Sequence, residues 1–384
     1  MAAPAHAFFV PGRVEVLGKH TDYAGGRSLL AAIDRGFTVE IRPGDGPSIR
    51  ITDAGRSETV DLDAGTGATA SSLDWATYPA AVARRVARDC PGVLGGCRIR
   101  LSSDLPPAAG LSSSSALVTA VFLALDALFD LSDTVQYRAA IPDREALAAY
   151  LGALERGAPY PGLGGEDPGV GTRGGSEDHV ALLCAEAGRL VRYRFEPVAR
   201  EGAVAMPAGH VFAIAVSGVA AEKAGSARAR YNRLSDEAAR AAALWRKATG
   251  GSHPHPGAIL AEHGGLGRLR DVLWCSARAG ERDALRRRVR HFAAESDEIV
   301  PAAFDALAAR DLEAFGEQVD RSQALAEELL GNQVPETTRL ARSARELGAV
   351  AASAFGAGFG GSVWAMIPEP DGPAFLQAWK APHL

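Results

Sequence analysis

The sequence predicts an α+β protein of two domains, and three observations support this. The chain has 384 residues, whereas one domain typically uses roughly 150, so it has room for two. Its 47% hydrophobic and 23% charged residues are ordinary for a globular protein with a sizeable core. Strand-like segments are weighted to the first half of the chain and long helical segments to the second. We therefore expect residues 1–207 and 208–384 to form separate domains.

Short strands are expected where β-branched and aromatic residues recur at every second position, as in half-buried strands. These segments are residues 37–42, 48–52, 97–102, 189–195 and 211–217. Longer segments rich in Ala and Leu have the periodicity of helices. They are residues 73–88, 113–131, 144–156, 222–247, 282–299 and 311–330, whereas the Gly- and Pro-rich residues 157–175 are typical of a loop.

The composition argues against several classes of protein. A net charge of −5, without a basic run that could act as a footprint, argues against a nucleic-acid partner, so none is expected. The apolar segment 116–128 carries Asp126 and is too short to cross a bilayer, so no membrane partner is expected either. Four cysteines without metal-ligand spacing fit reduced thiols and a cytoplasmic location. One basic run on a predicted helix is expected to be a solvated face: Arg286, Arg287, Arg288 and Arg290.

Glycine, with 43 residues, is clustered, and the second cluster along the chain predicts a phosphate site. Residues 105–112 form a loop that leads directly into an apolar helix, where free backbone N–H groups and the helix dipole favour an anion. An ordinary serine N-cap is the alternative, but four consecutive serines exceed what a cap needs. A hydroxyl here can also ligate Mg²⁺. The residues expected to bind nucleotide are Ala109, Gly110, Leu111, Ser112, Ser113, Ser114 and Ser115.

The first cluster sets polar side chains among glycines, which suits hydrogen bonding to a polyhydroxylated ligand. Its polar residues are Arg13, Lys19, His20, Asp22 and Tyr23. It is not a phosphate-binding P-loop, because Lys19 is followed by His instead of Ser or Thr. The third cluster, residues 356–361, precedes a strand pattern, so we expect a glycine turn between two strands that allows close backbone approach.

A fourth polar group lies at residues 174–179, directly before a short apolar run. Asp178 within it is either an acidic residue that stabilises a helix start or a base that faces a substrate hydroxyl. Residue type and position alone leave both interpretations open.

Together the three clusters resemble, in order and separation, the three motifs of the GHMP kinases. The run Gly18-Lys19-His20-Thr21-Asp22-Tyr23 is similar to the galactokinase signature in particular. Other short motifs also resemble those of the family. They are the Trp75-x-x-Tyr78 motif, the Tyr231-Asn232 pair, the Arg290-His291-x-x-x-Glu295 motif and residues 356–361. The resemblance implies the two-domain GHMP kinase fold. Residues 1–207 would form a ribosomal-protein-S5-domain-2-like α/β domain with the sugar motif and the ATP phosphate loop, and residues 208–384 a ferredoxin-like α+β domain with the third motif.

The same resemblance implies a cytoplasmic sugar kinase that uses ATP and Mg²⁺ to phosphorylate the anomeric (C1) hydroxyl of a monosaccharide, with galactose as the default. Asp178 would be the catalytic carboxylate and Arg13 would stabilise the reacting oxygens. Ser114 would ligate Mg²⁺ together with Glu155, or with the competing Glu166. The sugar-binding positions fall on Lys19, His20, Asp22, Gly175 and Tyr231, the adenine positions on Trp75 and Tyr78. The partners implied are the monosaccharide and ATP, and the protein would be a monomer or a homodimer.

Three residues depart from the family pattern and bear on the substrate. Lys19 replaces the glutamate that accepts a hydrogen bond from the sugar 6-hydroxyl in the family, and a lysine can only donate. Glu15 and His179 replace a usual Asn and a usual Gln. Either Lys19 pairs internally with Glu15 or Glu177, or it faces an anionic C6 group of a galacturonate-like or other modified sugar. A non-catalytic sugar-sensing regulator is a third hypothesis, which the intact serine loop and Asp178 disfavour.

Overall fold

The computed structural model describes residues 6–106, 109–220 and 225–380, and the chain divides into two compact units. The first unit contains Met1–Arg13, Ala32–Pro107 and Leu111–Cys184, and the second contains Val14–Ala31, Ala108–Gly110 and Ala185–Leu384. Strands β1 (His6–Leu17) and β2 (Arg27–Pro43) each run through both units. The boundary expected near Pro207 falls inside the second unit, because strands after Cys184 pair with the start of β2.

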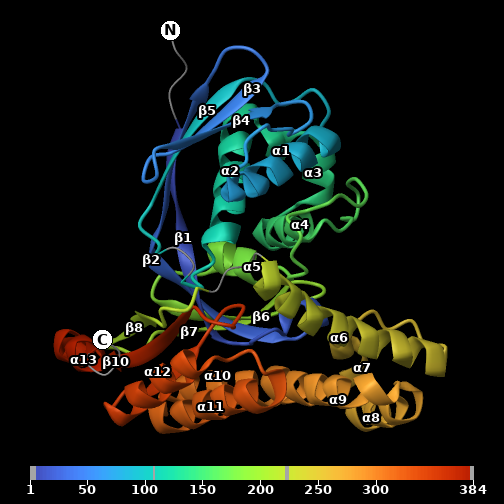
Figure 1. Ribbon diagram of the computed structural model, residues 1–384, viewed down its shortest axis with the longest axis vertical. Coiled ribbons are helices and arrows are strands. Elements are labelled where there is room, and N and C mark those ends of the chain that lie inside the picture. Colours follow the sequence, from blue (N-terminus) through green and yellow to red (C-terminus); the bar gives the residue numbers. More distant parts are fainter. Residues whose placement is uncertain (1–5, 107–108, 221–224, 381–384) are drawn as a thin grey trace. The chain divides into compact units, whose positions relative to one another are not determined.

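The first unit is a sheet covered by helices (Figure 1). Its strands β3 (Ser48–Asp53), β4 (Glu58–Asp63) and β5 (Cys97–Ser103) join β2 in the order β4-β3-β5-β2. The β3–β5 pair is parallel and the other pairs are antiparallel. The helices are α1 (Thr77–Asp89), α2 (Ser113–Phe129), α3 (Val135–Ala140), α4 (Arg144–Arg156) and α5 (Glu177–Cys184).

Local signals explain these elements. Ile49 and Ile51 of β3 are fully buried while Arg50 between them is exposed, which is the alternation expected of a sheet with one solvated face. Helix α4 begins after Asp143, whose side chain accepts a hydrogen bond from the Ala146 backbone N–H at 2.8 Å. It ends at Gly157, which takes a left-handed φ of 76°.

The second unit contains two separate sets of strands. Strands β6 (Arg189–Arg194) and β7 (Ala199–Ala205) form an antiparallel hairpin that pairs with Arg27–Leu30 of β2. Strands β8 (His210–Val216), β10 (Ser362–Pro368) and β9 (Ala351–Ala354) form an antiparallel sheet in that order. The helices are α6 (Gly225–Thr249), α7 (Pro256–Leu260), α8 (Gly265–Ser276), α9 (Ala279–Ala293), α10 (Val300–Ala309), α11 (Leu312–Leu325), α12 (Pro335–Glu346) and α13 (Gly372–Lys380).

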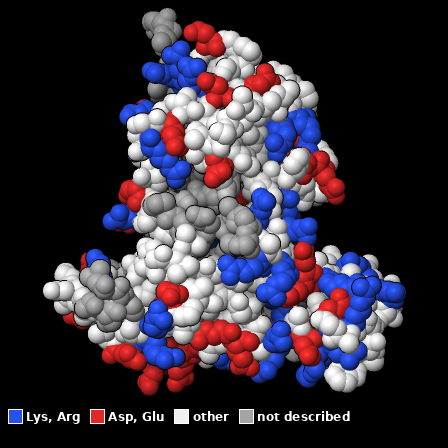
Figure 2. All heavy atoms as spheres, in the orientation of Figure 1, with Lys and Arg blue, Asp and Glu red and all other residues white. Residues whose placement is uncertain are grey.

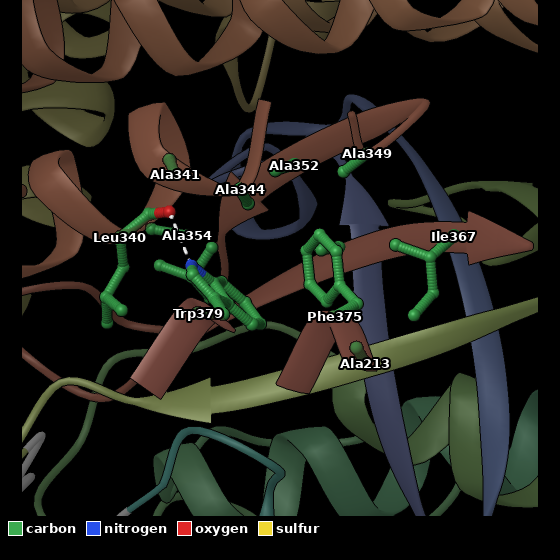
Figure 3. Packing of buried hydrophobic residues seen from close by; sticks show 12 residues of the cluster. Ala213, Leu340, Ala341, Ala344, Ala349, Ala352, Ala354, Ile367, Phe375 and Trp379 are labelled. Carbon is green, nitrogen blue, oxygen red and sulfur yellow. Dashed lines mark hydrogen bonds between the residues drawn. The ribbon is translucent and has the colours of Figure 1, made fainter. Parts of the chain in front are cut away.

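Small side chains bring α12 and α13 close to the β8-β10-β9 sheet (Figure 3). Ala344 of α12 and Ala365 of β10 are fully buried, and Trp379 of α13 fills the space beside them at 1% exposure. The Trp379 indole N–H donates to the Leu340 carbonyl at 3.1 Å, so its polar atom is satisfied inside the core.

The glycine turn expected at residues 356–361 is confirmed, since it joins β9 to β10. A Cβ added at Gly358 would lie 2.4 Å from the Asn332 carbonyl oxygen, and one at Gly360 would lie 2.5 Å from that of Val219. Both positions also have positive φ, at 75° and 134°. These glycines therefore allow the close backbone approach that the sequence predicted.

Several elements differ from the sequence expectations. The helix expected at 282–299 is α9 followed by a π-helical segment, Ala294–Ile299, and the one at 311–330 is α11 followed by another, Ala326–Leu330. The helix expected from 222 is described from Gly225, since 222–224 lie outside the described residues. The expectation that the basic run forms a solvated face is wrong for Arg288. This residue is 1% exposed, and its guanidinium donates to the backbone carbonyls of His20 and Leu234.

Across the ranges that the structure describes, no helix has both the length and the apolar character needed to cross a membrane. All four cysteines are free thiols: Cys90, Cys97, Cys184 and Cys275.

Candidate active site

The two residues predicted to be catalytic are in direct contact in the first unit. Asp178 lies in the first turn of α5, and Arg13 lies in β1. The Arg13 Nε donates to Asp178 Oδ1 at 2.8 Å, and a second guanidinium nitrogen lies 2.6 Å from the same oxygen. The side chains are 4% and 16% exposed, so this charge pair is largely shielded from water. Such pairs hold a carboxylate in a fixed orientation.

Ser115 connects Asp178 to a second carboxylate. Its hydroxyl lies 2.9 Å from Glu155 Oε2 and 3.2 Å from Asp178 Oδ2, both within donating distance. Helix α2 begins at Ser113, so Ser115 is in its first turn, and it is 1% exposed. Ser114, which the sequence favours as a metal ligand, is half-buried, whereas the hydroxyl that bonds both carboxylates is that of Ser115. The two serines differ because consecutive residues of a helix point in different directions, so Ser115 faces the interior and Ser114 does not.

His179 supports Glu155 from the other side. Its Nε2 lies 3.0 Å from Glu155 Oε2, and its Nδ1 lies 3.1 Å from the Thr119 hydroxyl. His179 is 1% exposed, and both ring nitrogens have polar partners. His179, one of the three residues that depart from the family pattern, thus orients the carboxylate of Glu155, the candidate metal ligand. The sequence alone does not reveal this role.

The oxygen donors of this group suit Mg²⁺, which prefers hydroxyl and carboxylate oxygens shared with phosphate. Glu155 is the candidate that lies beside the serine loop, whereas Glu166 is exposed and its carbonyl accepts a hydrogen bond from Arg88. A site made of three or more His, Cys, Asp or Glu side chains is not found in the described part of the chain. A Mg²⁺ here would therefore need ATP oxygens and water to complete its coordination.

The serine loop has the backbone shape expected of a phosphate cradle. Gly110 and Ser112 both have left-handed φ values, of 76° and 58°, which turn the chain sharply before α2. The Arg13 backbone N–H donates to the Leu111 carbonyl at 3.5 Å. The Ser112 hydroxyl is buried and has no hydrogen-bond partner within the described residues, so it is a donor available to a phosphate oxygen. Pro107 and Ala108 of the loop lie outside the described residues.

The two aromatic residues expected at the adenine lie three positions apart where α1 begins. Trp75, in a short 3₁₀ turn (Asp74–Ala76), is 9% exposed, and its indole N–H donates to Glu58 Oε2 at 2.7 Å. Tyr78 is half-buried in the first turn of α1. Gly175, the sugar position nearest to Asp178 in the chain, is half-buried just before α5.

In the second unit, the first glycine cluster brings His20, Tyr23 and Tyr231 together. The His20 Nδ1 lies 2.8 Å from the Tyr23 hydroxyl, and the rings of His20 and Tyr231 have centroids 5.2 Å apart. The His20 Nε2 lies 3.0 Å from the Ala357 carbonyl, which can only accept, so Nε2 carries the proton. Burial raises the pKa of the Tyr23 hydroxyl, which therefore stays protonated and can donate to Nδ1. Asp22, in the same loop, is 8% exposed.

Lys19 is directed into the interior of the second unit. It is 1% exposed, and its Nζ donates to the Ser322 hydroxyl at 2.9 Å. Ser322 in turn donates to Glu295 Oε1 at 2.9 Å, which also accepts the Gly18 backbone N–H at 2.8 Å. The partner of Lys19 is thus a hydroxyl instead of Glu15 or Glu177, and Glu15 Oε2 accepts the Gly356 N–H at 3.3 Å.

Comparison with known proteins identifies the family. Residues 1–43 match the galactokinase galactose-binding signature, residues 77–158 the GHMP kinases N terminal domain and residues 303–383 the GHMP kinases C terminal model. The structure is similar to that of Lactococcus lactis galactokinase complexed with galactose, with a TM-score of 0.81 at 22% identity over 100% of this chain and 90% of that chain. It is also similar to Methanococcus jannaschii mevalonate kinase, with a TM-score of 0.60 at 13% identity over 99% and 96%.

Streptococcus pneumoniae phosphomevalonate kinase, solved in complex with phosphomevalonate and AMPPNP, has a TM-score of 0.60 at 17% identity over 98% of this chain and 97% of that chain. The three family models cover more than half of the 384 residues, in the order that the motifs have along the chain. The chain belongs to the GHMP kinase superfamily and, within it, to the galactokinase family of ATP-dependent sugar kinases.

Proposed function

We propose that this kinase transfers the γ-phosphoryl group of ATP to the anomeric C1 hydroxyl of a monosaccharide, with galactose as the default acceptor. The observation that carries the proposal is the contact of Arg13 with Asp178, beside the start of the serine-rich helix. The match to a galactose-binding signature supports galactose.

In the proposed reaction, the C1 oxygen attacks the γ-phosphorus and the bond to the ADP oxygen breaks. Asp178 orients the C1 hydroxyl and accepts its proton as the new P–O bond forms. Arg13 holds that carboxylate in place and keeps a positive charge close to the reacting oxygens. Backbone N–H groups and hydroxyls at the start of α2 bind the phosphates.

Mg²⁺ is part of the proposal, with Ser115 and Glu155 as the side chains that would hold it. The ion would neutralise charge on the β- and γ-phosphates. His179 would keep the Glu155 carboxylate turned toward Ser115. Ser114 would contribute to the phosphate loop instead of the metal. His20, Asp22, Gly175 and Tyr231 keep their predicted roles at the sugar, as do Trp75 and Tyr78 at the adenine.

The test is ADP release from MgATP and galactose, with ³¹P NMR to locate the phosphate on the sugar. The expected product is a C1 phosphate ester. Asp178→Asn should lower kcat by about 10²–10⁴-fold, the usual contribution of a general base. Asp133→Asn is the matched control, because Asp133 is exposed and lies on the 3₁₀ turn after α2. A phosphate on C6, or equal activity of both variants, would contradict the proposal.

A second candidate acceptor is a sugar with an anionic group at C6, which the motif position of Lys19 suggests, whereas its burial and its bond to Ser322 favour an internal role. The Lys19 ammonium has three donors, of which the Ser322 hydroxyl uses one. Lys19→Glu should change the preference between galactose and galacturonate far more than it changes the KM for ATP. Steady-state kinetics with both sugars measures this, and an equal effect on both would leave Lys19 without a role in acceptor choice.

A further inference from the structure

Outside the residues of the proposed reaction, the second unit contains an arginine-lined groove between α8, α9 and α11. The groove has a volume of ≈ 560 Å³. Five arginines line it: Arg270 of α8, Arg286, Arg287 and Arg290 of α9, and Arg321 of α11. Leu325 and Leu329 supply apolar surface between them.

The groove is strongly positive although the whole chain has a net charge of −5. Its five arginines are opposed by two acidic lining residues, Asp283 and Glu298, which leaves an excess of three positive charges. Arginine stays ionised at any pH at which the protein is folded. Arg286 and Arg290 are four residues apart on α9, an arrangement of like charges that is unfavourable on a helix. A bound anion would relieve this repulsion.

Few of these charges are neutralised by the protein. Arg321 pairs with Glu298, and Arg290 lies 3.9 Å from Glu328 with both side chains more than half exposed. Arg270, Arg286 and Arg287 form no ion pair within the residues that the structure describes. Their guanidinium groups are therefore available to a ligand.

An exposed tryptophan lies next to the groove. Trp274 of α8 is 57% exposed, and the guanidinium carbons of Arg282 and Arg286 lie 5.0 and 5.3 Å from its ring centroid. Arg286 thus both lines the groove and stacks against an indole. Any ligand that engages Arg286 changes the surroundings of Trp274.

We propose that this groove binds a small molecule carrying two or more phosphate groups, at a site separate from the serine loop. Guanidinium groups bind phosphate oxygens through two parallel hydrogen bonds, and a cluster of three unpaired ones suits linked phosphates. The leucines can contact an apolar part of the same molecule. The inference does not depend on the acceptor sugar or on the proposed reaction.

Inorganic tripolyphosphate is the probe, titrated into the full chain while intrinsic tryptophan fluorescence is followed, to which the exposed Trp274 is one of five contributors. We expect saturable binding that weakens as salt is raised. The double variant Arg286→Ala/Arg287→Ala should raise Kd by about tenfold or more, whereas Arg342→Ala should leave it unchanged. Arg342 is a matched control because it is an exposed arginine on α12, outside the groove.

Equilibrium dialysis with labelled tripolyphosphate gives a second readout for variants that alter the fluorescence itself. If the double variant does not fold, as judged by circular dichroism, Arg270→Ala on α8 replaces it. An unchanged Kd in the arginine variants would overturn the proposal, because the probe would then be bound elsewhere, as at the serine loop. Absence of binding to the unmodified chain would overturn it as well.

Discussion

Ser115 contacts the carboxylates of Glu155 and Asp178, whereas Ser114 is turned toward a less buried position. Successive residues of an α-helix point about 100° apart, so a shift of one residue decides which serine faces the interior. The spacing of a serine run does not reveal this register. The contacts of α2 with α4 and α5 fix it, because they bury one side of the helix start.

This register gives a prediction for Mg²⁺ dependence. Ser115→Ala removes the hydroxyl between the two carboxylates and should raise the Mg²⁺ concentration for half-maximal activity by about 10–100-fold. Ser114→Ala should have a much smaller effect, since Ser114 is less buried and the hydroxyl between the carboxylates is that of Ser115. ADP release at varied Mg²⁺ measures both variants. If Ser114→Ala had the larger effect, the metal would be held as the sequence alone suggested.

At the scale of elements, the turn between β9 and β10 depends on the absence of a side chain at Gly360. Its φ of 134° is one that L-residues rarely adopt, and an added Cβ would lie 2.5 Å from the Val219 carbonyl oxygen. Gly360→Ala should therefore cost about 3 kcal/mol of unfolding free energy, because strain and a backbone clash add. Urea denaturation of the full chain measures the loss.

Gly348→Ala is the matched control for this prediction. Gly348 also has a positive φ, of 91°, but nothing lies within 4 Å of its added Cβ. Gly348→Ala should lower the free energy of unfolding by about 1 kcal/mol, which is the strain of a left-handed backbone alone. Equal losses for the two variants would show that the close approach to Val219 contributes nothing.

Elements with strong local signals were predictable from the sequence. Helix α4 has the expected bounds because Asp143 caps its start and Gly157 ends it. Strand β9 has no such signal, since its four residues are all buried and three are alanines, which favour helices when isolated. Its pairing with β10 makes it a strand. Long-range pairing of this kind cannot be read from a short segment.

In the candidate site too, residues in local motifs were predictable, whereas contacts that need long-range packing were not. Arg13 and Asp178 were identified from motifs, and the structure brings them into contact. The support of Glu155 by His179 was not predicted, because it requires α4 and α5 to pack side by side. The burial of Arg288 was missed because its hydrogen-bond acceptors are carbonyl groups of distant residues, which no helix pattern reveals.

For the molecule as a whole, buried histidines should make stability depend on pH. His291 of α9 is fully buried, and neither ring nitrogen has a hydrogen-bond partner among the described residues. Burial, and then the positive charge of the neighbouring Arg288, lower the pKa of His291 well below its ordinary value. Burial also lowers the pKa of His255, whose Nδ1 accepts the Ala258 backbone N–H at 3.1 Å.

A histidine with a lowered pKa stays neutral in the folded chain, while the unfolded chain takes up a proton below about pH 6.5. The unfolded state then binds more protons, so the free energy of unfolding should fall as pH decreases below that value. The slope should approach about 1.4 kcal/mol per pH unit for each histidine that stays neutral. Urea denaturation between about pH 7.5 and pH 5.5 measures it, above the range in which carboxylates ordinarily titrate.

His291→Leu removes the titrating group and should flatten this decline by about the contribution of one histidine. The apolar side chain suits a site in which the imidazole makes no hydrogen bond within the described residues. His263→Gln is the control, because His263 is exposed and should leave the slope unchanged. A decline of the same steepness in both variants would mean that His291 is protonated equally in the folded and unfolded chain, and its burial would then carry no pH dependence.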